Sequence, residues 1–185
     1  MKSRAVFFDK DGTLIKDVPY NVDPELIELT EGAGESLRLL RQNNFRLFVV
    51  SNQSGVARGH FEESELDAVW RKLEELSGVE FDGFYFCPHY PEGIITEYSF
   101  ECDCRKPADG LIRRAAVEQN IDLENSWFIG DSPKDVSAGR RAGCRTILYA
   151  PGESLRKGDC EPDFAVKDLR DAAKLIVKAA TSFRA

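Results

Sequence analysis

The chain has 185 residues, of which 32 are Asp or Glu and 25 are Lys or Arg, so its formal net charge is −7. This acidic surplus argues against a general nucleic-acid binder, which would carry a basic surface. No apolar run approaches the ~18 residues of a membrane-spanning helix, and the apolar stretch near the N-terminus is too short for a signal peptide. We therefore expect a cytoplasmic protein with neither nucleic acid nor membrane as a partner, and a single domain over residues 1–185.

Short apolar segments that predict strands alternate along the chain with segments of helical periodicity. The expected strands cover residues 5–8, 46–50, 84–86, 127–129 and 145–148. The expected helices cover residues 34–42, 66–76, 111–117, 133–142 and 169–180. Strands that alternate with helices indicate parallel pairing. The sequence therefore predicts an α/β fold, a three-layer Rossmann-like domain in which helices cover both faces of a parallel sheet and no large cap domain is inserted.

Polar side chains follow several of these strands at the point where each strand ends. They are Asp9 and Asp11, Ser51 and Asn52, Cys87 and His89, and Asp131. In open parallel sheets the ligand crevice lies beyond the carboxyl ends of the strands. We therefore expect these residues to converge on one edge of the sheet.

Two carboxylates stand two residues apart in the segment Asp9-Lys10-Asp11-Gly12. In an extended chain they point to the same side, ~7 Å apart. Such a pair suits a reaction in which one carboxylate attacks a substrate and the other handles a proton. Taken alone, the segment is equally typical of a surface turn, since Asp and Gly are common turn residues.

The other strand ends favour a phosphate site. Residues 51–55 offer hydroxyls, amides and backbone N–H groups that suit an anion. Asp131 adds a third carboxylate, and oxygen ligands of this kind favour Mg²⁺. Arg105 and Lys106 supply positive charge for phosphoryl oxygens. For Asp135 we favour a structural role, because Ser132 and Asp135 fit a helix capping box.

The segment from Cys87 to Pro107 is predicted to be a long irregular loop without a helix. It contains Cys87 and His89 at one end and Cys102 and Cys104 at the other, which is a four-ligand set typical of structural Zn²⁺. In a reducing compartment such a cluster favours a metal over disulfides. The alternative is that these cysteines pack as small buried hydrophobes. Cys144, Cys160 and His60 are interpreted as ordinary structural residues.

The chain resembles the phosphatases of the haloacid-dehalogenase (HAD) superfamily in four segments: D-K-D-G-T-L at 9–14, S-N-Q-S-G-V-A-R-G at 51–59, R-K-P at 105–107 and G-D-S-P-K-D at 130–135. The resemblance spans residues 5–143 and implies a Rossmann-like fold and an aspartyl-phosphate mechanism.

The same resemblance implies individual roles. Asp9 corresponds to the nucleophile, and Asp11 to the general acid/base whose backbone carbonyl also binds Mg²⁺. Ser51 corresponds to the phosphate-binding hydroxyl, Lys106 to the phosphate-binding lysine, and Asp131 to the remaining carboxylate ligand of Mg²⁺. Asn52, Gln53 and Ser54 belong to the same phosphate- or substrate-binding set.

The zinc-type loop resembles one branch of that superfamily, the heptose-1,7-bisphosphate 7-phosphatases and histidinol-phosphate phosphatases. In that branch Asp17, Tyr20 and Arg105 correspond to positions near the substrate. A Lys that commonly follows the metal-binding Asp in the heptose enzymes is replaced here by Ser132.

The sequence alone leaves three functions possible. The leading one is a Mg²⁺-dependent sugar-bisphosphate phosphatase, and the histidine-pathway phosphatase is the nearest alternative. The third is a non-catalytic, zinc-stabilised binding module, against which the presence of both Asp9 and Asp11 argues. We expect a small phosphorylated molecule as the partner and a monomer as the oligomeric state.

Overall fold

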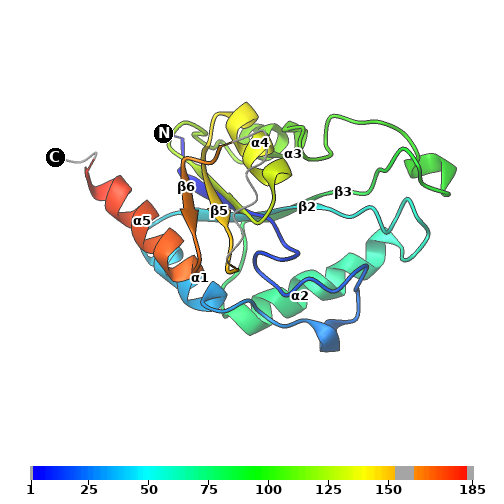
Figure 1. The fold of residues 1–185 in the computed structure, drawn as a ribbon, viewed down its shortest axis with the longest axis horizontal. Coiled ribbons are helices and arrows are strands. Elements are labelled where there is room, and N and C mark those ends of the chain that lie inside the picture. The colour runs from blue at the N-terminus through cyan, green and yellow to red at the C-terminus, as the bar shows by residue number, and fades with distance from the viewer. Residues whose placement is uncertain (1, 153–160, 183–185) are drawn as a thin grey trace.

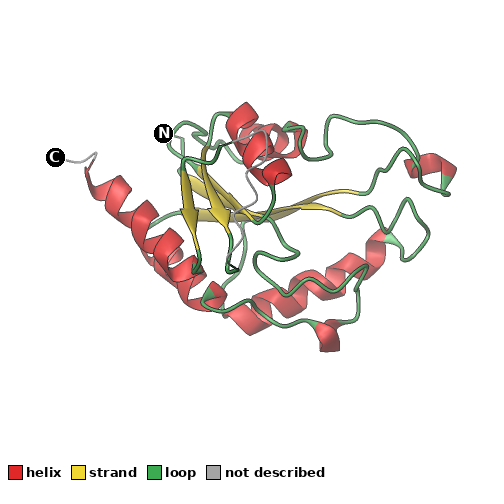
Figure 2. Ribbon diagram, in the orientation of Figure 1, coloured by secondary structure: helices red, strands yellow, loops and turns green. Residues whose placement is uncertain are grey.

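The computed structural model describes residues 2–152 and 161–182. In these residues six strands form one sheet in the order β3-β2-β1-β4-β5-β6, and every neighbouring pair is parallel. The strands are β1 (Ala5–Phe8), β2 (Arg46–Asn52), β3 (Gly83–Cys87), β4 (Trp127–Gly130), β5 (Arg145–Tyr149) and β6 (Phe164–Val166). Figure 2 shows this sheet between two layers of helices, as the sequence predicted.

The helices divide between the two faces of the sheet (Figure 1). They are α1 (Ala33–Gln42), α2 (Leu66–Ser77), α3 (Gly110–Glu118), α4 (Pro133–Ala142) and α5 (Leu169–Ser182). Helices α1, α2 and α5 lie on one face, and α3 and α4 cover the other. Single turns of 3₁₀ helix lie at Pro24–Leu26, Glu63–Glu65 and Thr96–Tyr98.

Strand β1 lies in the middle of the sheet and is buried on both sides. Its side chains alternate, so that Val6 and Phe8 pack in the core beneath α1, α2 and α5 while Ala5 and Phe7 pack in the core beneath α3 and α4. All four are completely buried. This explains why the strand is apolar throughout rather than alternating between polar and apolar residues.

The strand order reverses direction between β1 and β4. The chain runs outward from β1 through β2 to β3, and it then returns to the other side of β1 for β4, β5 and β6. At such a switch point the loops after the two central strands part and leave a crevice. Asp9 follows β1 and Asp131 follows β4, so the fold places both carboxylates at this crevice.

The structure departs from the sequence prediction in two places. The short strand β6 was not predicted, since its three residues follow a polar segment and carry no clear periodicity. The loop after β3 was predicted to lack a helix, and that was wrong by one 3₁₀ turn at Thr96–Tyr98. Cys160 lies outside the described residues. Among the described helices, none has both the length and the apolar character needed to cross a membrane.

Candidate active site and Cys/His cluster

Asp9 lies at the bottom of the crevice and is held from both the backbone and the side chain. Its backbone N–H donates to the Ile129 carbonyl at 2.9 Å, which fixes the residue between β1 and β4. The Nζ of Lys106 lies 2.5 Å from Oδ1 of Asp9 and 2.6 Å from Oδ1 of Asp135. Lys106 also donates to the Val50 carbonyl at 2.9 Å and is only 4 % exposed. A fixed cation therefore lies beside the carboxylate that was predicted to attack phosphorus.

Three carboxylates gather around this lysine. Oxygen atoms of Asp9, Asp131 and Asp135 all lie within 4.8 Å of one another. Gly12 permits this approach, because it adopts φ +82° and a Cβ there would lie 2.2 Å from Oδ2 of Asp131. Burial, together with the neighbouring carboxylates, outweighs Lys106 and raises the pKa of Asp9 to about 8. A single lysine does not balance this charge, so the group fits a divalent cation.

Asp11 is held apart from that group by its own partners. The Nζ of Lys10 lies 2.8 Å from Oδ1 of Asp11, and the side-chain amide of Gln53 donates to Oδ2 at 3.0 Å. The same Gln53 amide donates to the Ser51 hydroxyl at 2.8 Å. Asp11, Gln53 and Ser51 therefore form one hydrogen-bonded chain along the crevice.

Asn52 connects the end of β2 to the backbone of Lys106. Its side-chain amide donates to the Lys106 carbonyl at 3.1 Å, and its side-chain oxygen accepts the Lys106 N–H at 3.0 Å. The Asn52 side chain thus forms hydrogen bonds with both the backbone N–H and the backbone carbonyl of Lys106. This contact explains how a lysine in a long loop is held against a buried carboxylate 97 residues away in sequence.

A pocket of about 240 Å³ opens beside these residues. Most of the predicted substrate-binding residues line it: Asp17, Tyr20, Asn52, Gln53 and Ser54, together with Asp11. Tyr20 is half exposed, adopts φ +55° and stacks on His60 at 4.1 Å between ring centroids. Arg105 lies outside this wall, with its Nη1 donating to the His89 carbonyl at 3.3 Å.

The predicted Cys/His set is brought together at the start of the loop after β3. Sγ of Cys104 lies 3.1 Å from Sγ of Cys87, 3.1 Å from Sγ of Cys102 and 3.2 Å from Nδ1 of His89. These separations are far longer than the ~2.05 Å of a disulfide, and all four ligand atoms lie within 4.8 Å of one another. Four such atoms suit one tetrahedral ion with ligands at ~2.0–2.3 Å. Without a cation, hydrogen bonding to Cys87 and burial raise the pKa of the Cys104 thiol.

Two contributions to the site were not found from the sequence. The sequence assigns no role to Lys10, yet this lysine is 1 % exposed and pairs with Asp11. Asp135 forms the expected capping box with Ser132 and in addition binds Lys106. For Lys10, a usable sequence signal is a lysine placed directly after an apolar strand. For Asp135, no sequence signal distinguishes a residue that only caps a helix from one that also binds a lysine.

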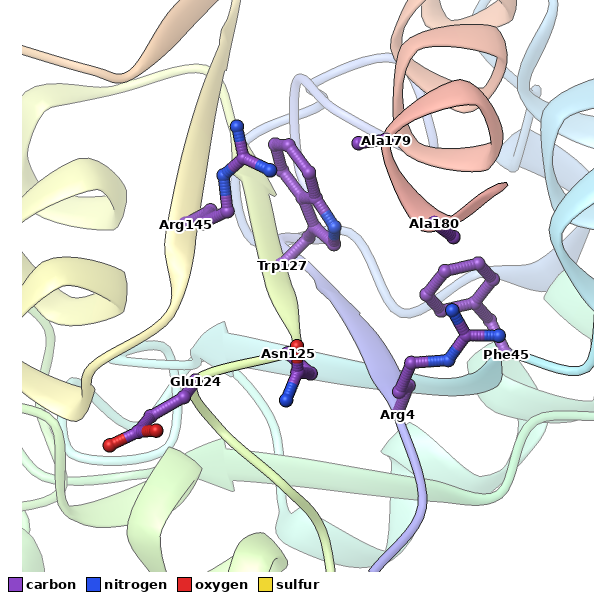
Figure 3. Close-up of a pocket in the computed structure, with 8 residues that line it drawn as sticks. All are labelled: Arg4, Phe45, Glu124, Asn125, Trp127, Arg145, Ala179 and Ala180. Carbon is purple, nitrogen blue, oxygen red and sulfur yellow. The ribbon is translucent and has the colours of Figure 1, made fainter. Parts of the chain in front are cut away.

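A further pocket, of about 260 Å³, lies at the opposite edge of the sheet (Figure 3). It is bounded by residues at the amino ends of the strands and by α5, and it contains none of the predicted site residues. The Arg4 guanidinium lies 4.6 Å from the Phe45 ring centre, and that of Arg145 lies 4.1 Å from the Trp127 ring centre. These stacked pairs cover buried aromatic rings at the edge of the core.

Comparison with known proteins agrees with this geometry. A family model described as HAD-hydrolase-like matches residues 103–172. The chain is 39 % identical over 177 residues to the D-glycero-beta-D-manno-heptose-1,7-bisphosphate 7-phosphatase of Haemophilus ducreyi, covering 92 % of this chain and 97 % of that protein. It is 34 % identical over 179 residues to the Escherichia coli K12 protein of the same name, covering 94 % of each.

Solved structures show the same fold. A putative HAD-like phosphatase from Mesorhizobium loti superimposes with a TM-score of 0.84 at 29 % identity, covering 96 % of this chain and 87 % of that one. The D,D-heptose 1,7-bisphosphate phosphatase from B. bronchiseptica, complexed with magnesium and phosphate, gives 0.80 at 29 % identity over 95 % and 99 %.

A parallel sheet with paired carboxylates at its switch point and a buried lysine beside them defines a phosphoric monoester hydrolase of the HAD type. Within that class, the sequence identity to the similar enzymes and the share of each chain that aligns identify the family. The chain belongs to the family of D-glycero-beta-D-manno-heptose-1,7-bisphosphate 7-phosphatases.

Proposed function

We propose that this protein removes the 7-phosphate from D-glycero-β-D-manno-heptose 1,7-bisphosphate through an aspartyl-phosphate intermediate on Asp9. The observation that carries the proposal is the buried Lys106–Asp9 pair at the switch point of the sheet, with a pocket of about 240 Å³ beside it. The names of the similar enzymes supply the substrate.

Asp9 is the nucleophile in this proposal. Its carboxylate is buried and oriented by Lys106, so one oxygen is held while the other is left to attack phosphorus. A nucleophile positioned in this way gains most of its advantage from orientation. Lys106 and the Ser51 hydroxyl then neutralise and bind the oxygens of the transferring phosphoryl group.

Asp11 is the general acid and base. It stands two residues after Asp9, and Lys10 and Gln53 fix its carboxylate at the pocket wall. It donates a proton to the leaving sugar oxygen in the first half-reaction. In the second it accepts a proton from the water that attacks the aspartyl phosphate, which returns Asp9 to its starting state.

Two metal ions belong to the proposal. Asp9, Asp131 and the backbone carbonyl of Asp11 would hold Mg²⁺, which supplies positive charge where the phosphoryl oxygens lie. The similar enzyme from B. bronchiseptica was solved in complex with magnesium and phosphate, which supports this assignment. The set Cys87, His89, Cys102 and Cys104 would hold Zn²⁺ with no open position, so its role is structural.

The sugar and its second phosphate are assigned to the residues around the pocket. Asp17, Tyr20 and Ser54 provide hydroxyl-binding groups and one aromatic face, while the Asn52 amide beside them is bound to the Lys106 backbone. Arg105 follows Cys104 directly and precedes the phosphate-binding Lys106, so the zinc-type loop sets its position.

The test is a phosphate-release panel with the purified protein and Mg²⁺. Its members are the α and β anomers of heptose 1,7-bisphosphate, a hexose bisphosphate, histidinol phosphate and a small aryl phosphate. We expect the β-heptose bisphosphate to have the highest kcat/KM and the product to be the 1-phosphate. A preference for histidinol phosphate would replace the proposed substrate, and the absence of turnover on every member would favour a non-catalytic module.

A further inference from the structure

Two arginines of different loops converge on the ring of Tyr90. The guanidinium carbon of Arg58 lies 4.0 Å from the Tyr90 ring centre, and that of Arg105 lies 5.1 Å from it. Arg58 comes from the loop after β2, and Tyr90 and Arg105 come from the two ends of the loop after β3. One aromatic ring therefore lies against two arginines that are 47 positions apart in the sequence (105 minus 58).

Neither guanidinium has a carboxylate partner among the residues that the structure describes. The Arg105 guanidinium donates from Nη1 to the His89 carbonyl at 3.3 Å. The Nε of Arg58 is buried and has no hydrogen-bond partner. Two like charges that lie 4.0 and 5.1 Å from one ring centre without a described acid beside them repel each other. The quadrupole of the Tyr90 ring offsets part of the repulsion between the two guanidinium groups. A bound anion would offset the remaining repulsion.

The two loops that carry these residues are locked together next to the cations. The Ala57 carbonyl accepts hydrogen bonds from the N–H groups of Ile94 at 2.8 Å and Ile95 at 3.0 Å. Gly93 packs so closely that a Cβ there would lie 2.6 Å from the same carbonyl oxygen. The backbone around Arg58 and Tyr90 is therefore fixed, and side-chain stacking decides where the guanidinium groups point.

We propose that Tyr90 is a positioning residue that holds Arg58 and Arg105 as a two-guanidinium clamp for the second phosphate of a bisphosphate substrate. This inference rests on the proposed function. Tyr90 neither touches the reacting phosphate nor takes part in proton transfer. It sets substrate preference by holding both guanidinium groups against its ring. Arg105 directly precedes Lys106, the lysine that binds Asp9. The chemistry that the clamp recognises is a phosphate dianion on the part of the substrate remote from Asp9.

The decisive experiment compares Tyr90→Leu with Tyr90→Phe on three substrates. They are heptose 1,7-bisphosphate, heptose 7-phosphate and a small aryl phosphate. Leu keeps apolar bulk but has no ring, whereas Phe keeps the ring and loses only the hydroxyl bond to Glu92. For Tyr90→Leu we expect KM for the bisphosphate to rise about tenfold with kcat within twofold of wild type. KM for the two monophosphates should stay within twofold, and Tyr90→Phe should match wild type on all three.

Tyr98→Leu is the matched control, because Tyr98 lies in the same loop and no guanidinium of the described residues is stacked on its ring. Its KM for the bisphosphate should not change. Zinc content and melting temperature of every variant show whether the loop has kept its structure. Equal losses on all three substrates in a Tyr90→Leu protein that keeps its zinc would overturn the clamp, as would an unchanged KM for the bisphosphate.

The design separates failure of the clamp from failure of the proposed function. A wild-type enzyme that hydrolyses the aryl phosphate but not the heptose bisphosphate contradicts the proposed substrate. The same bisphosphate is then used as a competitive inhibitor of aryl phosphate hydrolysis. A roughly tenfold higher inhibition constant for Tyr90→Leu than for wild type supports the clamp, and equal constants reject it.

Discussion

The side chain of Asn52 pairs with the backbone of Lys106 through two hydrogen bonds, of 3.1 and 3.0 Å. Asn52 is the last residue of β2, so the rigid sheet reaches the catalytic lysine through a single amide. The lysine then reaches Asp9 and Asp135 with its Nζ. The position of the charge at the phosphate therefore depends on a residue that needs no contact with the substrate.

Replacing Asn52 by Ala should lower kcat/KM for every phosphate ester, because both hydrogen bonds to the Lys106 peptide groups are lost together. We expect a fall of about tenfold to a hundredfold, from the loss of two hydrogen bonds worth ~1 kcal/mol each and the resulting misplacement of Lys106. Steady-state kinetics with the aryl phosphate measure this. If the aryl phosphate is turned over normally and only the heptose substrate is affected, Asn52 acts on the sugar and not on the lysine.

Asp9→Asn should abolish turnover and leave the fold intact, since an amide does not attack phosphorus. The loss of a covalent nucleophile costs several orders of magnitude in rate. Phosphate release measures the loss, and circular dichroism verifies the fold. More than a tenth of wild-type activity in this variant would remove Asp9 from the nucleophile role.

Asp11→Asn should slow both half-reactions, but unequally for a substrate with a good leaving group. Departure of an aryl oxide needs little acid help, whereas attack of water on the aspartyl phosphate still needs the base. Phosphoenzyme should accumulate, and mass spectrometry of the acid-quenched protein should find one added phosphate on Asp9. A label on any other residue contradicts the assignment of the nucleophile.

Much of the site could be predicted from the sequence, because parallel strands bring their carboxyl ends to the same edge of the sheet. Short apolar runs identified five of the six described strands, and Asp9, Ser51 and Asp131 then had to meet. Contacts that depend on how loops pack were not predictable. The Asp135 contact with Lys106 requires the start of α4 to face a loop some thirty residues earlier, and two arginines meet Tyr90 only after two loops have docked.

Asp82 gives a test of stability that is independent of catalysis. Burial works to raise its pKa, but hydrogen bonds from the Leu47 N–H, Arg46 and Arg41 outweigh it and hold the pKa below its usual value. These bonds, of 2.8, 2.9 and 2.7 Å, join the start of β2 and the end of α1 to the start of β3. The ionised carboxylate therefore stabilises the folded protein.

Because the folded pKa of Asp82 is depressed, its contribution is present above the unfolded pKa of ~3.9 and is lost as pH falls through the lower folded pKa. Asp82→Asn should destabilise the protein by about 1–3 kcal/mol at pH 7, and the difference from wild type should shrink below about pH 4. Denaturant unfolding across pH measures this. Asp171→Asn, which breaks an exposed pair with Lys174, is the control and should change little. A pH-independent difference for Asp82→Asn contradicts the charge argument.

The Cys/His cluster leads to the last prediction, which concerns zinc. The purified protein should contain about one zinc per chain, and Cys102→Ser should release it. The core should stay folded, because most of the residues of the two core clusters come from the sheet and its helices rather than from the loop. Arg105 donates to the carbonyl of the zinc-binding His89, so loss of the ion should disturb it together with Lys106. KM for a bisphosphate should then rise more than KM for an aryl phosphate. Cys144→Ser is the matched control, since Cys144 is buried outside the cluster and should leave the zinc in place. A wild-type protein without zinc that keeps full activity under a zinc-selective chelator would return all four residues to a purely packing role.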